Sequence, residues 1–283
     1  MDFDRLLGLI GLVVGVAPYG ALVLRWAAAR RPARSFLGLN RTQPVEVIVS
    51  TNASKAAGAG EAKTFMTAVG ELRAVAVGAR TVLPLYKRKK VSVFMSEEYP
   101  GRLQADTLIL GGPLRNKYAQ RLIDYLNRGY PEACLHLDAL ASEIGIGGKV
   151  LRFDQHREGG VPQEDLALLL LARVQGQDGT EQRFVLCAGL STYGTEGAAR
   201  FLFQRIMKST PEAVRLRRLL DGKVAAGIVH VHIQARQVIR TELLEETCWS
   251  TDRRANLASG RRPATASNPV DLRHRTHVLP HHD

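Results

Sequence analysis

The sequence predicts an α/β fold, namely a Rossmann-like mixed sheet with flanking helices, preceded by one transmembrane helix. Three observations predict it: an uncharged apolar segment near the N-terminus, short apolar strands alternating with amphipathic helices, and a twice-repeated order of strand, glycine-rich loop and helix. The chain has 283 residues, of which 45% are hydrophobic and 23% charged. This composition is typical of globular proteins and excludes a collagen-like or fully disordered chain.

Composition and charge divide the chain into four parts. We expect a transmembrane anchor over 1–26, a basic juxtamembrane linker over 27–43, a cytoplasmic α/β domain over 44–250 and a disordered basic tail over 251–283. The formal net charge of +12 is concentrated around the linker, in the tail and in the run Lys87–Lys90. The rest of the chain is close to neutral, so a nucleic-acid-binding face is not expected.

The anchor is predicted by nineteen uncharged residues, Leu6–Leu24. A helix of this length spans about 28 Å, close to the hydrocarbon thickness of a bilayer. Five arginines follow between Arg25 and Arg41 with no acidic residue among them, whereas two aspartates and one arginine precede the segment. The positive-inside rule predicts a single-pass protein of the inner (plasma) membrane. Its N-terminus would lie outside, its main domain in the cytoplasm and its arginines against anionic lipid.

Two alternatives to the anchor are a cleaved signal peptide and a buried core helix. Ala27–Ala29 is similar to a signal-peptidase site, but the apolar run is long and the basic residues follow it rather than precede it. Glycines and Pro18 within the run disfavour a soluble helix. A membrane anchor therefore remains the main expectation for this segment.

The first half of the domain favours three strands and two helices. The strands are predicted at Val45–Val49, Val91–Met95 and Thr107–Leu110. The third is continuously apolar, as expected of a strand covered on both faces. Helical spacing of apolar residues predicts one helix from about Phe65 that ends near Gly78. A second helix stops at Gly129, and its apolar face carries Ala119, Leu122, Ile123 and Leu126.

The second half favours an antiparallel hairpin, two helices and a last strand. Asp165–Val174 and the strand Arg183–Ala188 flank a turn at Asp178-Gly179, so we expect a mixed sheet. Val229–Ala235 alternates apolar and polar residues, as an antiparallel strand with one wet face does. The first helix places Ala199, Leu202, Phe203 and Ile206 on one face, and the second is expected over Glu212–Leu220.

The first candidate site is the loop Gly111-Gly112-Pro113-Leu114-Arg115-Asn116, which follows the third strand. Glycines at the carboxyl end of a buried strand let backbone amides approach a ligand, and the N-terminus of the next helix favours an anion such as phosphate or carboxylate. Arg115 adds a charged donor, and Asn116 either contacts the ligand or caps the helix. The alternative is a tight strand-to-helix turn with Asn116 as its cap.

The second candidate site is the loop over 189–197, which follows another buried strand. Its candidate ligand contacts are Gly189, Ser191, Thr192, Tyr193, Gly194 and Thr195. We expect both loops at the carboxyl edge of the sheet, where open α/β sheets bind ligands, and facing one anion-sized crevice. Thr195 is alternatively a plain helix cap. Residues 50–52, Ser-Thr-Asn, close the first strand and either line this crevice or form a turn.

Neither loop matches an established nucleotide-binding or nucleophile motif, because G-x-G-x-x-G, Walker A and G-x-S-x-G are all absent from them. The sequence therefore assigns no cofactor and no reaction. Glu196 and Asp106 are the carboxylates nearest to the loops, and we consider them weak catalytic candidates. The three cysteines allow no disulfide framework and are interpreted as reduced thiols, with Cys187 in the core.

Two histidines offer half of a metal site. His230 and His232 project from one face of the last predicted strand. The sequence identifies no third ligand, and alternating polar residues also suit an exposed sheet face, so no metal is assigned.

The segments DTLILGGPLRN and VLCAGLSTYGTEGAARFL resemble a group of uncharacterised bacterial, often actinobacterial, membrane-anchored Rossmann-like proteins with GGPxxN and AGxxxYGT loops. The resemblance covers roughly residues 45–207 and implies no particular activity. The GGP loop is also faintly similar to loops of nucleoside deoxyribosyltransferase-like and TIR-like Rossmannoid domains, which handle nucleotides. Those families use a catalytic glutamate, for which Glu196 would be the candidate.

The leading hypothesis is a membrane-anchored cytoplasmic domain that binds a nucleotide-like or other phosphorylated small molecule between the two loops, as a sensor or effector. An enzyme of the glycosyl-transfer or nucleotide-hydrolysis type would need a carboxylate in the crevice. The alternative from another class is a non-catalytic, membrane-tethered interaction or scaffold module, in which the glycine loops are structural.

Overall fold

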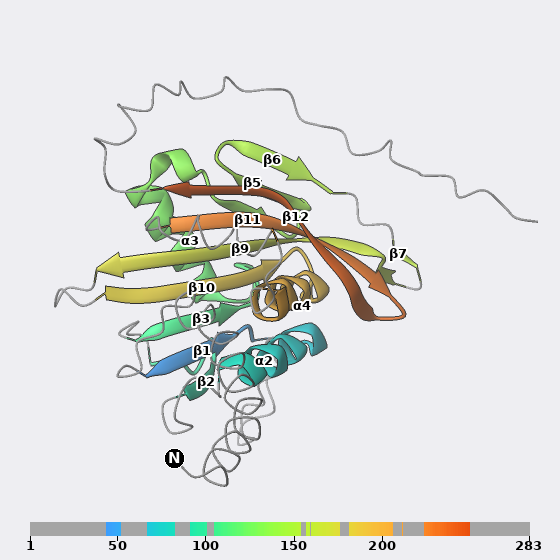
Figure 1. Ribbon diagram of the computed structural model, residues 1–283, viewed down its shortest axis with the longest axis horizontal. Helices are drawn as coiled ribbons and strands as arrows, with labels where there is room; N and C mark the ends of the chain where they lie inside the picture. Colours follow the sequence, from blue (N-terminus) through green and yellow to red (C-terminus); the bar gives the residue numbers. More distant parts are fainter. Residues whose placement is uncertain are drawn as a thin grey trace, which may run out of the picture.

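The computed structural model describes residues 44–51, 67–82, 91–100, 105–153, 157–158, 160–175, 181–205, 211 and 224–249. At its centre lies a seven-stranded mixed sheet of order β12-β11-β9-β10-β3-β1-β2 (Figure 1). The strands of this sheet are β1 (Val45–Val49), β2 (Val91–Met95), β3 (Asp106–Leu110), β9 (Glu164–Gln175), β10 (Glu181–Gly189), β11 (Val224–Gln234) and β12 (Gln237–Trp249).

The sheet has a parallel half and an antiparallel half. Strands β2, β1, β3 and β10 run parallel to one another, and β9, β11 and β12 then alternate in direction. The short strands β4 (His136–Asp138), β5 (Glu143–Ile146) and β6 (Lys149–Arg152) form a second antiparallel sheet, and β7 (Arg157–Glu158) pairs with β8 (Val161–Pro162). The α/β class and the mixed sheet predicted from the sequence are confirmed.

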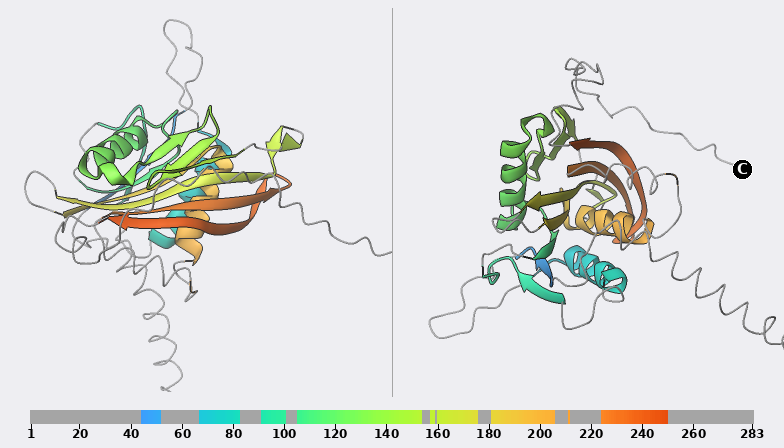
Figure 2. Two further views of the ribbon diagram at one scale, coloured as in Figure 1. Left: turned by 90° about the horizontal axis from the view of Figure 1, so that it is seen from above. Right: turned by 60° about the vertical axis from the view of Figure 1, so that its left-hand side comes forward.

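Helices cover both faces of the large sheet. Helices α2 (Val69–Val82) and α4 (Thr192–Arg200) lie side by side on one face, whereas α3 (Lys117–Gly129) and the β4–β6 sheet cover the other (Figure 2). A short 3-10 turn (Pro131–Ala133) follows α3, and a π-helical turn (Phe201–Arg205) extends α4. Alternate residues of β9 serve the two cores: Ala167, Leu169 and Leu171 face α4, while Leu166, Leu168 and Leu170 face α3.

Most of the predicted elements are present. The strands β1, β2, β3, β10 and β11 and the β9–β10 hairpin lie where the sequence predicts them, and β3 is buried along its whole length. Helix α3 ends at Gly129 and buries the predicted apolar face. The sequence does not predict β12 or the β4–β6 sheet, because neither has a regular period-2 pattern of apolar residues.

The predicted end of the first helix at Gly78 is wrong. Helix α2 continues through Gly78 to Val82. A Cβ at Gly78 would lie 3.3 Å from the Phe203 ring and 3.4 Å from Leu108. The glycine therefore serves close packing of the helix on the sheet and does not terminate it.

Several predictions concern residues outside the described ones. They include the anchor Leu6–Leu24, the linker over 27–43, the run Lys87–Lys90, the turn Asp178-Gly179, the helix Glu212–Leu220 and the tail over 251–283. Among the described residues, no helix combines the length and apolar character that crossing a bilayer requires.

Candidate functional site

The two glycine loops meet at one edge of the sheet. Strands β3 and β10 are parallel neighbours with Leu110 opposite Cys187, so both loops leave from the same carboxyl edge. The Gly111 amide donates a hydrogen bond to the Cys187 carbonyl at 2.9 Å. A Cβ at Gly112 would lie only 3.2 Å from the Gly189 carbonyl oxygen. The predicted placement of both loops at one edge of the sheet is therefore confirmed, whereas an anion-sized crevice between them stays a prediction.

The first loop is a tight turn capped by Asn116. The amides of Arg115 and Asn116 donate to the Gly112 carbonyl at 3.2 and 3.0 Å. The fully buried Asn116 side chain accepts from the Tyr118 amide at 3.1 Å and donates to the Leu110 carbonyl at 3.2 Å. These donors already have partners within the protein. The Arg115 side chain is exposed.

The second loop is shorter than the sequence predicts, because α4 begins at Thr192 and its N-cap is Ser191 rather than Thr195. Thr195 lies inside the helix, where its hydroxyl accepts from the Gly189 amide at 3.0 Å. The Thr192 hydroxyl donates to Glu71 of α2, and Tyr193 packs against the core. Most of the predicted ligand contacts of this loop thus have structural partners.

A carboxylate of the protein itself occupies the N-terminus of α4. The fully buried Asp165 accepts from the Ser191 amide at 3.0 Å, the Ser191 hydroxyl at 2.5 Å, the Gly194 amide at 2.7 Å and its neighbour Leu166 at 2.8 Å. Burial raises the pKa of this carboxyl, and the hydrogen bonds oppose the rise. Asp165 therefore fills the position in which an anionic ligand of α4 would sit.

The residues after β1 contact the first loop. The Ser50 amide donates to the Leu110 carbonyl at 3.0 Å, and the Thr51 amide donates to the Arg115 carbonyl at 3.2 Å. A Cβ at Gly111, where φ is +107°, would lie 2.6 Å from the Ser50 Cβ, so close packing explains this glycine. The third residue of this group, Asn52, lies outside the described residues.

The two carboxylates considered as weak catalytic candidates, Glu196 and Asp106, each bind partners within the protein. Glu196 is fully buried between the guanidinium groups of Arg200, at 2.8 Å, and Arg73, at 3.4 Å. Asp106 begins β3 and accepts from the Arg183 amide at 3.1 Å. Asp106 thus lies at the opposite end of β3 from the loops, and the structure does not bring it near them. Cys187 is buried as expected, and burial raises the pKa of its thiol.

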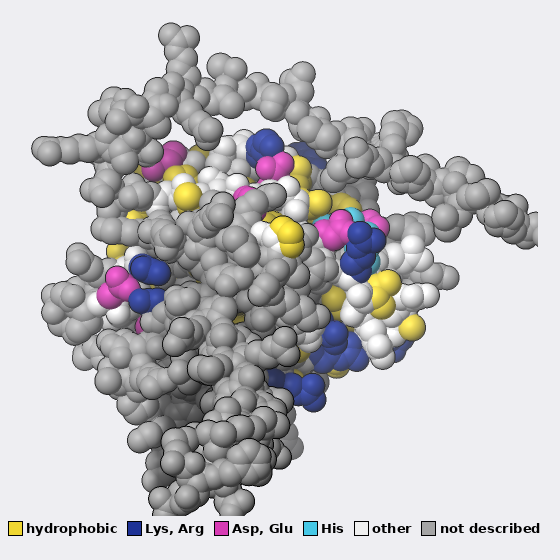
Figure 3. Space-filling model, in the orientation of Figure 1, with side chains coloured by type: hydrophobic (Ala, Val, Ile, Leu, Met, Phe, Trp, Pro, Cys, Tyr) yellow, Lys and Arg dark blue, Asp and Glu magenta, His cyan; other side chains and the backbone are white. Residues whose placement is uncertain are grey.

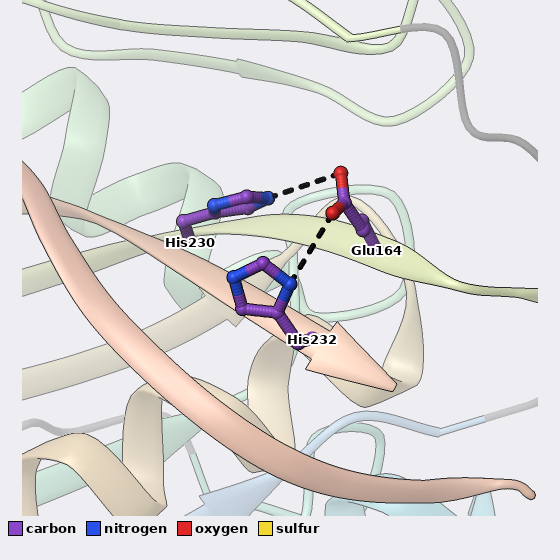
Figure 4. Close-up of side chains that lie close together, drawn as sticks. All are labelled: Glu164, His230 and His232. Atoms are coloured by element: carbon purple, nitrogen blue, oxygen red, sulfur yellow. Dashed lines mark ion pairs between the residues drawn. The ribbon is translucent and has the colours of Figure 1, made fainter. Parts of the chain in front are cut away.

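A cluster of metal-ligating side chains lies elsewhere, at the amino end of β9 and the carboxyl end of β11. Strand alternation puts His230 and His232 on one face, and the pairing of β9 with β11 sets Glu164 directly opposite His232. The Nε2 atom of His230 lies 3.3 Å from one carboxylate oxygen of Glu164, and the Nδ1 atom of His232 lies 3.2 Å from the other (Figure 4). One ligand atom from each of the three residues lies within 4.8 Å of the others.

The surroundings of His230 favour its neutral form. Burial lowers its pKa, the neighbouring His232 lowers it further, and Glu164 raises it in part. The Nε2 atom is buried and makes no hydrogen bond with any described residue, although the Glu164 carboxylate is near. The Phe153 ring packs edge-on against the imidazole, with 5.9 Å between the ring centroids. A neutral imidazole nitrogen is the form that binds metal ions.

A groove of about 640 Å³ adjoins this cluster, and Glu164 and His232 form part of its wall. The other lining residues come from the chain before β9 and from the β11–β12 hairpin: Val161, Pro162, Gln163, Ile233, Gln234, Ala235, Arg236 and Ile239. On the face shown in Figure 3, histidine side chains (cyan) lie beside acidic (magenta) and basic (dark blue) ones. His232 and Glu164 are both partly exposed, so the cluster is open to solvent on its groove side.

The sequence indicates His230 and His232 as half of a possible metal site without assigning a metal, and it misses the third member of the cluster. Glu164 lies 66 positions before His230, and no local spacing connects them. They meet because β9 pairs with β11, and the order of strands in a sheet cannot be read from spacing. A candidate partner could have been sought among the acidic residues at strand ends, but the sequence offers many of them.

Comparison with protein-family models, with curated proteins and with solved structures found no match for this chain.

Proposed function

We propose that this chain is a metal-binding α/β protein whose Glu164, His230 and His232 hold one divalent transition-metal ion of the zinc class. The observation that carries the proposal is the geometry of the three side chains. Ligands bonded to a tetrahedral zinc ion at about 2.0–2.1 Å lie about 3.3–3.4 Å apart. The two nitrogen–oxygen separations in the cluster are 3.3 and 3.2 Å. The three ligand atoms all lie within 4.8 Å of one another, so side-chain rotations that draw them closer would bring them onto one ion.

The donor set suits this class of metal. Imidazole nitrogen and carboxylate oxygen bind zinc, and two histidines with one carboxylate is the ligand set of catalytic rather than structural zinc sites. Three protein ligands leave the fourth position open for water or a ligand. The same set accommodates Fe²⁺, so metal analysis of the purified protein decides between the two ions.

Metal titration of the full chain in detergent tests the proposal. We expect one Zn²⁺ per chain, and at least a ten-fold loss of affinity in Glu164→Gln and in His232→Gln. A matched control is available in the ion pair of His136 and Glu143, whose nitrogen and oxygen lie 3.5 Å apart on the small sheet. His136→Gln should leave the affinity unchanged. If wild-type protein binds no ion, the cluster is an ordinary ion pair and the proposal fails.

A second candidate function is the binding of a nucleotide-like or other phosphorylated molecule at the glycine loops. The specific observation in its favour is that the chain leaves β1 toward α2 on one face and β3 toward α3 on the other. In the sheet, β2 lies next to β1 on one side, and β10 lies next to β3 on the other side. The strand order therefore reverses between β1 and β3, and this is where Rossmann-like sheets bind ligands. A rise in the melting temperature with nucleotides, lost in Arg115→Gln, would support this function. The absence of any shift would favour structural loops.

The location of the domain is a separate part of the proposal. It rests on Leu6–Leu24 and the arginines that follow, which predict a single-pass anchor with the α/β domain at the cytoplasmic face. The proposed metal site would then lie in a domain that is tethered to the cytoplasmic face of the inner membrane.

A further inference from the structure

We infer that the open coordination position of the metal binds the carboxylate of a small organic acid whose apolar part lies in the adjoining groove. This inference rests on the proposed metal site and names the class of ligand that the site would take. Access, charge and the lining of the groove each support it.

Access to the ion is from the groove. The Glu164 and His232 side chains, which line the groove, are 45% and 28% exposed, whereas the His230 side chain is 17% exposed and packs against Phe153. A ligand can therefore approach on the side of Glu164 and His232 but not past His230. The fourth metal position would face the same side.

The charges at the site favour an anion. A divalent ion held by one carboxylate and two neutral imidazoles keeps a net charge of about +1. On β12, Arg240 lies opposite His232 and Glu242 lies opposite His230, and these two side chains pair with each other. Their charges therefore balance. Arg236, which lines the groove and is exposed, adds a further positive charge.

The groove also offers apolar surface to the rest of the ligand. A β-bulge in β12 places Ile239 between the pair His232–Arg240 and the pair Ile233–Val238, and leaves its side chain 60% exposed. Val161, Pro162 and Ile233 complete the apolar part of the lining. A volume of about 640 Å³ is within the range of small-molecule sites. The ligand would therefore be an amphipathic acid rather than a bare anion.

The test uses the full chain loaded with Co²⁺, whose visible absorption responds to the ligands of the ion. Acetate, butyrate and hexanoate are titrated separately, with inorganic phosphate as a comparison. We expect each acid to change the spectrum and the affinity to rise with chain length, by up to about four-fold per added methylene. Ile239→Ser should abolish this rise, and Arg236→Gln should lower the affinity for all three acids. Leu140→Ser and Arg152→Gln alter exposed residues outside the groove and should behave as wild type.

The outcomes separate this inference from the proposed function. If Co²⁺ binds but no acid changes its spectrum, or if affinity does not depend on chain length, the inference is wrong and the metal site stands. Tighter binding of phosphate than of every carboxylate would also overturn it. If Co²⁺ does not bind, the proposed function itself fails. Unchanged Co²⁺ binding in Ile239→Ser and Arg236→Gln shows that the variants are folded.

Discussion

At the scale of single residues, the clearest lesson is that a polar side chain takes its role from its neighbours in space. Asp165 and Glu164 are adjacent in the chain and point to opposite faces of β9. One is fully buried and caps α4, while the other is half-exposed and faces two histidines. Two adjacent carboxylates thus have a structural and a proposed functional role.

Asp165→Asn should destabilise the protein by about 2–4 kcal/mol, because an amide cannot accept at both of its ends and would set an N–H donor against the buried N–H groups. The Ser191 amide and hydroxyl and the Gly194 amide all donate to Oδ2, where the Asn oxygen could remain, so the NH2 group would face the Leu166 amide, which loses its acceptor at Oδ1. Thermal or denaturant unfolding of the full chain, followed by tryptophan fluorescence, measures the effect.

The matched control for this substitution is Asp124→Asn. Asp124 is an exposed residue of α3 that accepts from Gln120 at 2.7 Å. We expect less than about 0.5 kcal/mol of change there. Equal losses in the two variants would show that the cap contributes nothing specific.

At the scale of elements, local sequence predicts the start of α3 but not that of α4, whose N-cap is Ser191 rather than Thr195. The Asn116 cap of α3 is predicted as one of two alternatives and is present. The continuation of α2 through Gly78 is not predicted, because the reason for the glycine is the Phe203 ring from a distant part of the chain. The close packing of α4 on the sheet likewise depends on a distant residue, because Gly197 lies against Val231 of β11.

Gly197→Ala should destabilise the packing of α4 against β11. The added Cβ would lie 2.3 Å from a methyl group of Val231, which sits in the middle of a paired strand. We expect a loss of about 1–3 kcal/mol, measured as a lower melting temperature. Gly129→Ala, at the end of α3 with no atom within 4 Å of the new Cβ, should be neutral or stabilising. A neutral Gly197→Ala would mean that α4 can move away from β11 at little cost.

The β11–β12 hairpin has a strained tip that can be relieved. Its turn residues Ala235 and Arg236 have φ of 48° and 62°, in the left-handed region that suits Asn or Gly in two-residue hairpins. Ala235→Asn should therefore stabilise the protein by about 0.5–1 kcal/mol. Ala139→Asn, at a turn residue whose own φ is not positive, should not. A lower melting temperature in Ala235→Asn would contradict the conclusion that the backbone is strained at Ala235.

At the scale of the whole molecule, the predicted anchor would determine which compartment the proposed metal site faces. In vesicles whose cytoplasmic face is outward, we expect protease to digest the α/β domain, because the arginines between Arg25 and Arg41 hold the C-terminal flank on that side. Replacing these five arginines with glutamine should yield a mixture of orientations. A domain that resists digestion in intact vesicles and is cut after detergent is added would reverse the topology.

The sequence by itself determined the α/β class and most of the strands, because these depend on local periodicity. It indicated the Asn116 cap of α3 as one of two alternatives, and His230 and His232 as half of a metal site with no metal assigned. Only the tertiary structure decided that the two glycine loops hydrogen-bond within the protein, that Asp165 occupies the N-terminus of α4 and that Glu164 joins His230 and His232. The physical reason is strand pairing. Residues far apart along the chain become neighbours through the order and register of the sheet, which the free energy of the whole fold sets and no local spacing records.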